Sequence, residues 1–321
     1  MTFPIQDSAR VQDALRPDAR MPGTVPLADP LSGLASVVIL AGSVRANQLR
    51  RATGRSPLEM PIASSRTVMH EWCDRLADTA EAAGIAELPV RIMVDQAASP
   101  DFATDDHGPL RLRVERDPSS YRGTAGLLHD LAREYPDDAK LLVLHASQLP
   151  FASLGHALGY EHANSADVTI VADPQGSPSG IMLLRCGCLR DINTVGFVDL
   201  NEQALPNIAE KYDVRVHRTA QPVTRSLRTL SGYLETLRLF HHQRTGRLVH
   251  DGPFAEDWQA SFQVLEGGSF INDRAVIHDS VVLAGARVEA DAVIVRSVVC
   301  PGAVVGKGEH RVDRVVIGHK H

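Results

Sequence analysis

Aromatic residues are scarce in this chain of 321 residues, and long apolar runs are missing. Phe, Trp and Tyr make up 5% of the sequence, so the core has to be built mainly from Leu, Val, Ile and Ala. No apolar run approaches the roughly 18–20 residues that span a bilayer. The first residues include Asp7, Arg10, Asp13 and Arg16 instead of an apolar segment, so we expect neither a membrane span nor a signal peptide.

An excess of basic charge is also missing. The chain has 33 Lys and Arg against 39 Asp and Glu, a net charge of −6, and the basic residues are scattered. This distribution argues against a nucleic-acid-binding surface, so we expect no nucleic-acid partner. The length suffices for a large core and suggests about two domains.

Cysteine is limited to four residues, Cys73, Cys186, Cys188 and Cys300. Cys186 and Cys188 form a CxC pair, which is able to bind a metal. A structural zinc site needs four ligands, however, and no second pair occurs. We therefore favour small, reduced, buried thiols and predict a cytoplasmic location.

Strand and helix patterns alternate after an N-terminal segment, residues 1–33, that is rich in Pro, Asp and Arg and reads as an extended arm. The predicted strands are 36–42, 90–95, 140–146 and 167–173, and the predicted helices are 67–84, 123–136 and 232–243. This alternation predicts an α/β domain over 34–250, Rossmann-like, with a mostly parallel sheet and crossover helices.

The pattern changes at about residue 269, where short Val and Ile pairs recur. Val276, Val282, Val288 and Ile294 are six residues apart. This spacing fits three short strands per coil of about 18 residues, with one aliphatic side chain of each strand inside. We predict a linker and a short left-handed parallel β-helix (hexapeptide repeat) over 251–321; the alternative is an ordinary small β domain. The open edges of such a short β-helix would need a cap or a partner.

The first strand leads into the loop "LAGSVRANQLRRATGRSPLEMP", and the order of domains and motifs resembles the sugar-phosphate nucleotidyltransferases, or NDP-sugar pyrophosphorylases. The resemblance covers roughly residues 36–317. It implies transfer of a nucleotidyl group from a nucleoside triphosphate to a sugar 1-phosphate, with Mg²⁺ and release of pyrophosphate. The family loop reads LAGGxGTRLxPLT and is followed by PKPM; Leu40, Ala41 and Gly42 match its start.

The rest of that loop departs from the family. The second and third glycines fall on Ser43 and Arg45, and the basic residue of PKP falls on Leu58. Glycines allow a backbone to approach phosphates closely, so side chains at these positions obstruct a triphosphate. The missing lysine removes a charge that would help pyrophosphate leave.

A second segment, "GTAG", keeps the family pattern. The resemblance implies that Gly123, Thr124 and Ala125, with Leu40, Ala41, Gly42 and Ser43, are the vestigial nucleotide-binding positions. A helix N-terminus presents free N–H groups to an anion.

The two metal-binding aspartates of the family are both replaced. In the family motif LVxNGD the aspartate binds Mg²⁺, and here Ser147 takes that position after His145 and Ala146. The second aspartate, in DIGTPEDYL, aligns with Ser226. Hydroxyls are poor ligands for a hard dication. Asp173 and Asp191 are the nearest candidate replacements, and neither ends the right strand. The sugar-phosphate motif EKP is not recognisable between 174 and 190.

Four independent defects in one mechanism lead us to predict a catalytically inactive family member, without a cofactor, that serves as a regulatory, nucleotide- or sugar-nucleotide-sensing or scaffold subunit. We expect it to form a homo-oligomer, or a hetero-oligomer with an active homologue, through the β-helix. One alternative is an active nucleotidyltransferase with relocated Mg²⁺ ligands.

The other alternative is a hexapeptide acyltransferase-like protein, with His278 as general base; against it, a histidine in a turn is commonly only solvent-facing. Two further features stay open. The first loop is positively charged through Arg45, Arg50 and Arg51. These arginines either bind an anion loosely or are simply exposed to solvent. The pair His241-His242 and the terminal "HKH" are at most weak metal ligands.

Overall fold

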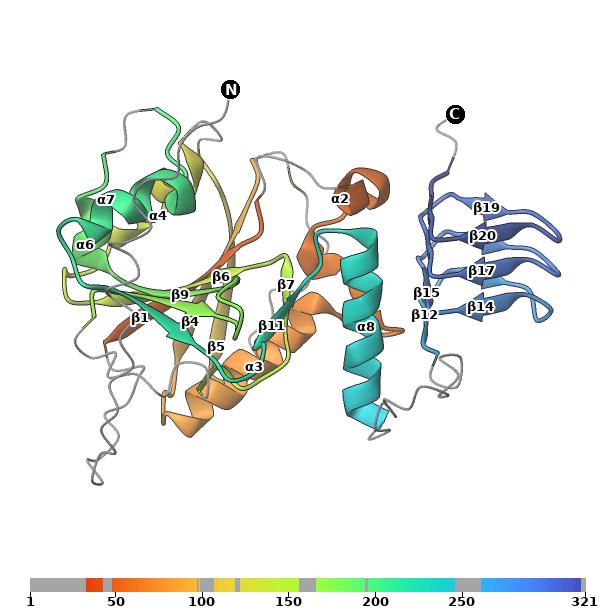
Figure 1. Ribbon diagram of the computed structural model, residues 1–321, viewed down its shortest axis with the longest axis horizontal. Coiled ribbons are helices and arrows are strands. Elements are labelled where there is room, and N and C mark those ends of the chain that lie inside the picture. The colour runs from red at the N-terminus through yellow and green to blue at the C-terminus, as the bar shows by residue number, and fades with distance from the viewer. Residues whose placement is uncertain are drawn as a thin grey trace.

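The computed structural model describes residues 33–42, 48–96, 98, 107–118, 122–155, 166–193, 196–245 and 261–318. The predicted N-terminal arm (except residue 33), Ser43, Arg45, the predicted linker up to residue 260 and the terminal "HKH" lie outside the described residues. The described elements form an α/β part and a stack of short strands on the C-terminal side, as Figure 1 shows.

A seven-stranded sheet lies at the centre of the α/β part, in the order β10-β8-β9-β6-β1-β4-β5. Its strands are β1 (Leu34–Leu40), β4 (Leu88–Val94), β5 (Leu110–Arg116), β6 (Lys140–His145), β8 (Val168–Ala172), β9 (Pro178–Arg185) and β10 (Val214–Arg218). Only β9 runs antiparallel, to both β6 and β8, and the other neighbours pair in parallel. A mostly parallel, Rossmann-like sheet is therefore confirmed.

Helices cover both faces of this sheet. The larger ones are α3 (Val68–Ala82), α4 (Gly123–Ala132) and α8 (Leu230–Thr245), and the shorter ones are α2 (Gln48–Thr53), α6 (Cys186–Arg190) and α7 (Leu205–Ala209). Successive side chains of a strand point to opposite faces. Accordingly Val37 and Ile39 join a core cluster with α3 and α8, whereas Val38 and Leu40 join a second cluster with α4, α6 and α7.

All four cysteines are buried, free thiols, as predicted. Burial raises the pKa of the Cys73 and Cys188 thiols to about 12, and that of Cys186 and Cys300 to about 11. The thiolate is the form that binds metals, so these residues are protonated structural side chains at neutral pH.

The C-terminal strands form three parallel sheets, which we call the three-sheet stack. Its first sheet contains β12 (Gln263–Leu265), β15 (Ser280–Val282), β18 (Val298–Val299) and β21 (Val315–Val316). The second contains β13 (Phe270–Ile271), β16 (Arg287–Val288) and β19 (Val304–Val305), and the third contains β14 (Val276–His278), β17 (Val293–Val295) and β20 (His310–Val312). Figure 1 shows these strands layered one above another.

The repeat of the stack is 17 residues, which corrects the predicted coil of about 18. Val264 pairs with Val281, and Val281 pairs with Val298. Because one side of each coil is one residue shorter, the six-residue spacing breaks between 277 and 282. Val276 is 55% exposed and Ile277, at 6%, lies inside instead, with Val282, Val288 and Ile294.

Corners at the same place in successive coils adopt the same backbone conformation. Gly268, Gly285 and Gly302 all have positive φ, at 87°, 77° and 74°. Glycine adopts this left-handed region without steric cost, so these positions keep the repeat in register. The stack also begins earlier than residue 269, because β12 already pairs with β15.

The three-sheet stack packs against the α/β part. Val264 and Val281 belong to the same core cluster as Tyr233 and Leu237 of α8. The rings of His241 and Phe262 stack at a centroid distance of 5.5 Å. In Figure 1, α8 lies between the central sheet and the stack. Helix α8 therefore connects the two parts through its apolar side chains.

Across the described ranges, no helix has both the length and the apolar content needed to cross a membrane.

Candidate functional site

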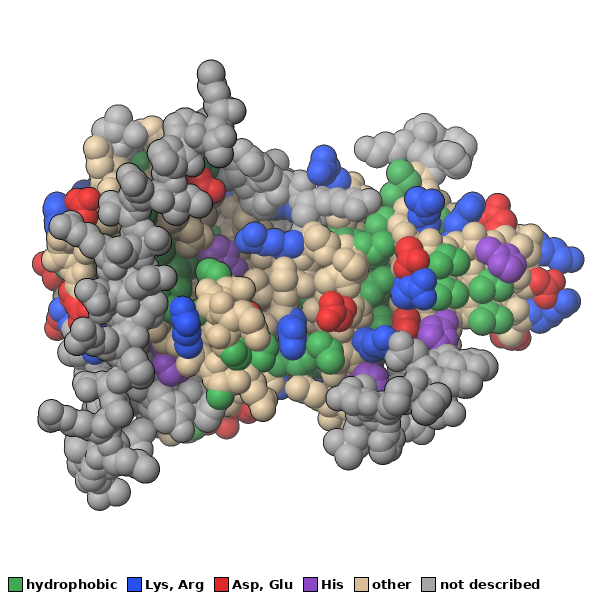
Figure 2. Space-filling model, in the orientation of Figure 1, with side chains coloured by type: hydrophobic (Ala, Val, Ile, Leu, Met, Phe, Trp, Pro, Cys, Tyr) green, Lys and Arg blue, Asp and Glu red, His purple; other side chains and the backbone are tan. Residues whose placement is uncertain are grey.

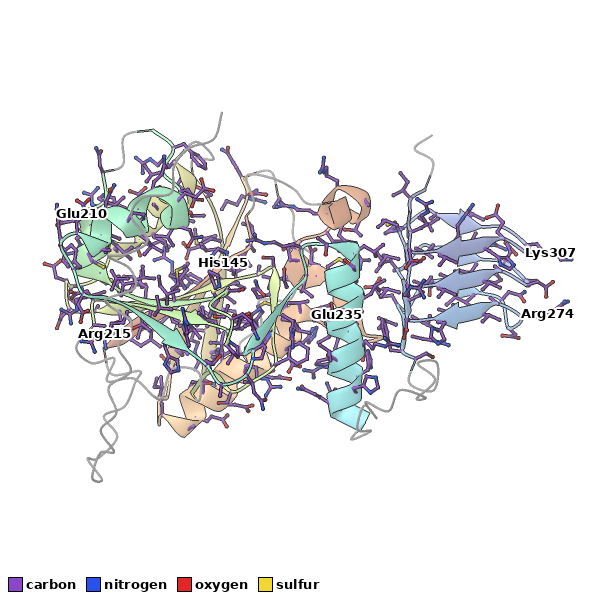
Figure 3. The ribbon with its side chains drawn as sticks, viewed as in Figure 1. His145, Glu210, Arg215, Glu235, Arg274 and Lys307 are labelled. Atoms are coloured by element: carbon purple, nitrogen blue, oxygen red, sulfur yellow. The ribbon has the colours of Figure 1, made fainter. Side chains whose placement is uncertain are left out.

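The carboxyl ends of β1, β4 and β6 meet at one edge of the sheet, where ligands of parallel α/β sheets commonly bind. These parallel strands pair side by side, with Leu40 opposite both Met93 and His145. The residues that follow them, Gly42, Asp95 and Ser147, therefore start from neighbouring positions. Figure 3 labels His145 within the α/β part, far from Arg274 and Lys307 on the stack.

Gly42 lies directly against Asp95. The N–H of Gly42 donates to the carbonyl of Met93 at 2.9 Å, and a Cβ at position 42 would lie 2.7 Å from Asp95 Oδ1. Asp95 in turn forms an ion pair with Arg50 of α2. The glycine is needed for this close approach, and the positive charge of Arg50 is engaged by a carboxylate of the same edge.

Leu58, at the position of the family's basic residue, belongs to the core. Its side chain is fully buried in the turn Pro57–Glu59, named η1, which Ser56 caps by accepting from the N–H of Leu58. A buried aliphatic side chain has no group to offer a phosphate. Leu58 contributes to packing in the core.

The start of α4 packs against residues 198–200. A Cβ at Gly123, whose φ is +72°, would lie 2.4 Å from the carbonyl oxygen of Val198. That carbonyl accepts from the N–H of Ala125 at 3.2 Å, and Thr124 Oγ1 accepts from the N–H of Leu200 at 3.1 Å. Gly123, Thr124 and Ala125, predicted as vestigial nucleotide-binding positions, thus make contacts within the chain.

Ser147 and Ser226 are brought together by a pair of short strands. Strands β7 (Gln148–Pro150) and β11 (Thr224–Ser226) pair antiparallel, with Ser226 opposite Gln148. The N–H of Leu227 donates to the carbonyl of Ser147 at 2.9 Å. The two serines, 79 positions apart in the printed sequence, therefore lie at one place on the carboxyl edge.

A cation, Arg228, lies beside these two serines. Its Nε donates to Ser147 Oγ at 3.4 Å, and its backbone N–H donates to Ser226 Oγ at 3.4 Å. Arg228 is exposed, and in the part of the chain that the structure describes no carboxylate forms an ion pair with it. Arg228 is not among the residues predicted from the sequence, although it lies only two positions after Ser226.

His145 completes this group of side chains. Burial lowers the pKa of His145, the nearby positive charge of Arg228 lowers it further, and the negative charge of Asp199 opposes both. His145 is therefore neutral at neutral pH. Asp199 caps the single turn Leu200–Ala204, named η2, where its Oδ1 accepts from the N–H groups of Asn201 and Glu202 at 2.8 and 3.0 Å.

These donors do not fit a divalent metal. Two hydroxyls and a guanidinium offer no carboxylate oxygen to Mg²⁺. Among the described residues, no group of three or more His, Cys, Asp or Glu is placed to hold a metal ion. Asp173 accepts from the N–H of Ser177 at 2.7 Å in its own turn, and Asp191 accepts from the hydroxyl of Tyr212 at 2.7 Å. Both candidate replacements thus have local partners.

His278 lies at a corner of the three-sheet stack. Its Nδ1 is 3.4 Å from Asp279 Oδ2, and Asp279 Oδ1 accepts from the N–H of Phe262 at 3.2 Å. This histidine is in contact with a carboxylate that holds the first coil in place. It is remote from the carboxyl edge of the sheet.

A cavity of about 550 Å³ lies at the amino ends of the strands, away from the site described above. Its lining includes ion pairs of the chain itself, Asp167 with Arg185 at 2.9 Å and Asp137 with Arg190. Its charged groups are thus largely engaged with one another, and we assign the candidate site to the carboxyl edge.

Comparison with known proteins gives structural matches alone. No family model matches the sequence, and no curated protein matches it. The similar solved structures include HddC from Yersinia pseudotuberculosis and the same protein complexed with GMP-PN. Both are 15% identical in sequence, and each match covers 64% of this chain and 99% of that chain, with TM-scores of 0.49 and 0.47.

Proposed function

We propose that this chain is a nucleotidyltransferase-like protein that does not catalyse nucleotidyl transfer and serves as a regulatory, nucleotide- or sugar-nucleotide-sensing or scaffold subunit. The observation that carries the proposal is the guanidinium of Arg228 beside Ser147, at the place where the paired strands β7 and β11 bring Ser147 and Ser226 together. A positive side chain at this place repels a divalent cation, and the two serines supply no charge to hold one. Nucleotidyl transfer depends on metal ions to neutralise the phosphates.

Residues that follow β1 further support the proposed absence of nucleotidyl transfer. Leu58 is buried in the core, so it replaces a phosphate-binding cation by a packing residue. Arg50 is paired with Asp95. The remaining architecture, a mostly parallel sheet with the exposed side chains of Ser226 and Arg228 at its carboxyl edge, retains the means to bind an anionic ligand without transforming it.

The three-sheet stack supplies the second half of the proposal. We infer that it is the left-handed β-helix that the repeat predicts, with three strands in every 17 residues, and that it mediates assembly with a second copy or an active homologue. Several large apolar side chains on it are exposed: Phe270, Val276, Val304, Val312 and Ile317. Figure 2 shows hydrophobic side chains gathered on the visible face of the stack. Light scattering on the purified chain, alone and with a candidate homologue, measures this association.

The catalytic part of the proposal is tested by the forward reaction. The chain is incubated with Mg²⁺, a panel of nucleoside triphosphates and a panel of sugar 1-phosphates, and sugar nucleotides are separated by chromatography. We expect none to form above the level without protein. Formation of any sugar nucleotide that requires Mg²⁺ would instead establish the alternative, an active enzyme with relocated ligands.

A further inference from the structure

We infer that Arg228, together with the hydroxyls of Ser147 and Ser226, forms a metal-independent binding site for the pyrophosphate group of a nucleoside diphosphate or sugar nucleotide. The inference rests on the proposed function, because it names the ligand that the inactive edge of the sheet would bind. It also assigns to the side chain of Arg228 the positive charge that a metal ion would otherwise supply.

The guanidinium of Arg228 is held in position but not neutralised. Ser147 Oγ accepts from the Nε of the guanidinium, and Ser226 Oγ accepts from the backbone N–H of Arg228, both at 3.4 Å. Among the described residues no carboxylate pairs with it, and the side chain is exposed. The two terminal nitrogens, Nη1 and Nη2, thus remain for a ligand, and a guanidinium binds phosphate oxygens in a bidentate manner.

The backbone that supports this side chain is hydrogen-bonded to two neighbouring elements. Arg228 follows β11, whose pairing with β7 fixes Ser226 opposite Gln148. The carbonyl of Ser226 accepts from Thr236 Oγ1 of α8 at 3.4 Å. A charge carried on a short turn between a paired strand and a long helix loses little conformational freedom when a ligand binds.

The other titratable groups described at this edge are neutral or have partners. His145 is neutral at neutral pH, and if it were protonated it would add a second positive charge. The packing around it is close, since a Cβ at Gly180 would lie 3.1 Å from the Cβ of His145. The carboxylate of Asp199 is turned to the N–H groups of η2, and Asp95 is paired with Arg50.

Extended polyanions are a poor alternative ligand. The chain carries a net charge of −6, and its basic side chains are scattered or paired with carboxylates. A compact pyrophosphate needs only a local positive charge with a few hydroxyl partners, which is what the edge provides. Figure 2 shows basic side chains beside a histidine near the middle of the visible face of the α/β part, with no continuous basic band.

The site is tested by calorimetry in EDTA, so that no divalent cation is present. The full-length chain is titrated with inorganic pyrophosphate, with ADP, GDP and UDP, and with UDP-glucose. Arg228→Ala removes the charge, and Arg228→Lys keeps the charge without the planar fork. Arg225→Ala is the matched control: Arg225 is an exposed arginine on β11, opposite Leu149, and its side chain follows the alternate direction from that of Ser226.

We expect the native chain to bind at least one of these probes in EDTA, and Arg228→Ala to weaken the binding by about tenfold or more. Arg228→Lys should fall between the two, and Arg225→Ala should stay within about twofold of the native chain. Tighter binding of a nucleotide than of inorganic pyrophosphate assigns the ligand to the nucleotide class, and equal affinity assigns it to pyrophosphate itself.

Absence of binding in EDTA, binding that appears only with Mg²⁺, or equal affinity of Arg228→Ala and the native chain would each overturn the inference. Thermal unfolding of each variant confirms that it is folded before titration. The outcomes also separate the two proposals. Turnover with Mg²⁺ refutes the proposed inactivity whatever the affinity in EDTA, whereas a chain that neither turns over nor binds refutes only the Arg228 site.

Discussion

The Nε of Arg228 donates to Ser147 Oγ at 3.4 Å, across a junction of two strands that are far apart in the sequence. The same junction brings Ser226 next to Arg228, because the backbone N–H of Arg228 donates to Ser226 Oγ. The resemblance to the sugar-phosphate nucleotidyltransferases predicts two carboxylates at positions 147 and 226, where the chain has two serines with a guanidinium beside Ser147. We infer that this edge favours an anion over a cation.

Restoring the two carboxylates should not by itself restore a metal site. In the double variant Ser147→Asp with Ser226→Asp, we expect the new carboxylates to pair with Arg228, which already lies within hydrogen-bond distance of position 147. Adding Arg228→Ala frees both for a dication. Mn²⁺ binding followed by electron paramagnetic resonance should therefore be weak in the double variant and at least about tenfold tighter in the triple variant. Equal Mn²⁺ affinity of the two would show that Arg228 does not control the site.

Anion affinity should increase as the pH falls. Burial and Arg228 both lower the pKa of His145, with Asp199 acting in the opposite direction, so the imidazole is neutral in the free protein at neutral pH. A bound anion favours the protonated form, and protonation therefore becomes coupled to binding as the pH falls toward the lowered pKa of His145 in the free protein. Sulfate keeps its charge over that range, and its dissociation constant, measured from about pH 8 down to about pH 5, should decrease.

The control for this pH dependence is His145→Gln, which removes the titrating group and keeps a hydrogen-bonding side chain. We expect its sulfate affinity to depend much less on pH than that of the native chain. An equally steep dependence in the variant would assign the effect to other groups at the edge.

Gly123→Ala should destabilise the start of α4. Position 123 has φ at +72°, and a Cβ there would lie 2.4 Å from the backbone oxygen of Val198. Gly196 is the matched control, because its φ is +81° and a Cβ there would meet nothing within 4 Å. Both variants place an alanine in a left-handed backbone conformation, and only Gly123→Ala also meets Val198. Its loss in the free energy of unfolding should therefore exceed that of Gly196→Ala by about 1–3 kcal/mol. Chemical denaturation measures both, and equal losses would contradict the contact.

The 17-residue frame of the stack predicts opposite results for two adjacent residues. Ile277→Asp places a charge inside the stack and should lower stability by about 3 kcal/mol or more, because the carboxylate would be buried without a partner. Val276→Asp changes an exposed side chain and should alter stability by at most about 0.5 kcal/mol. Thermal unfolding distinguishes the two variants. A larger loss of stability in Val276→Asp than in Ile277→Asp would instead support the six-residue spacing, in which Val276 lies inside the stack.

Part of the central sheet was predicted from the sequence. β1, β4, β6 and β8 correspond to the predicted strands, because they are mostly apolar runs between two covered faces. β5 and β10, at the two edges, were not predicted, although they alternate apolar residues with arginines such as Arg113 and Arg215, the pattern of a half-exposed strand. β9 was not predicted either, because a short apolar run does not by itself distinguish a buried strand from a helix.

The candidate site was predictable in part. The positions of Ser147 and Ser226 followed from the resemblance, and the structure brings them together. Arg228 lies two positions after Ser226, but its contact with Ser147, 81 positions away, depends on the pairing of β7 with β11, which the sequence does not show. The sequence prediction placed Val276 inside the stack, whereas the neighbouring residue Ile277 lies there. A spacing of six and a repeat of 17 agree at Val282, Val288 and Ile294 and differ by one residue before them.

The central claim is that this edge of the sheet binds phosphate without the metal-dependent chemistry of a nucleotidyltransferase. The most direct measurement is isotope exchange between labelled pyrophosphate and nucleoside triphosphate, in the presence of sugar nucleotides and increasing Mg²⁺, with the protein at stoichiometric concentration. We predict no exchange above the protein-free level at any Mg²⁺ concentration. Exchange that rises with Mg²⁺ and is retained through repeated purification would contradict the account.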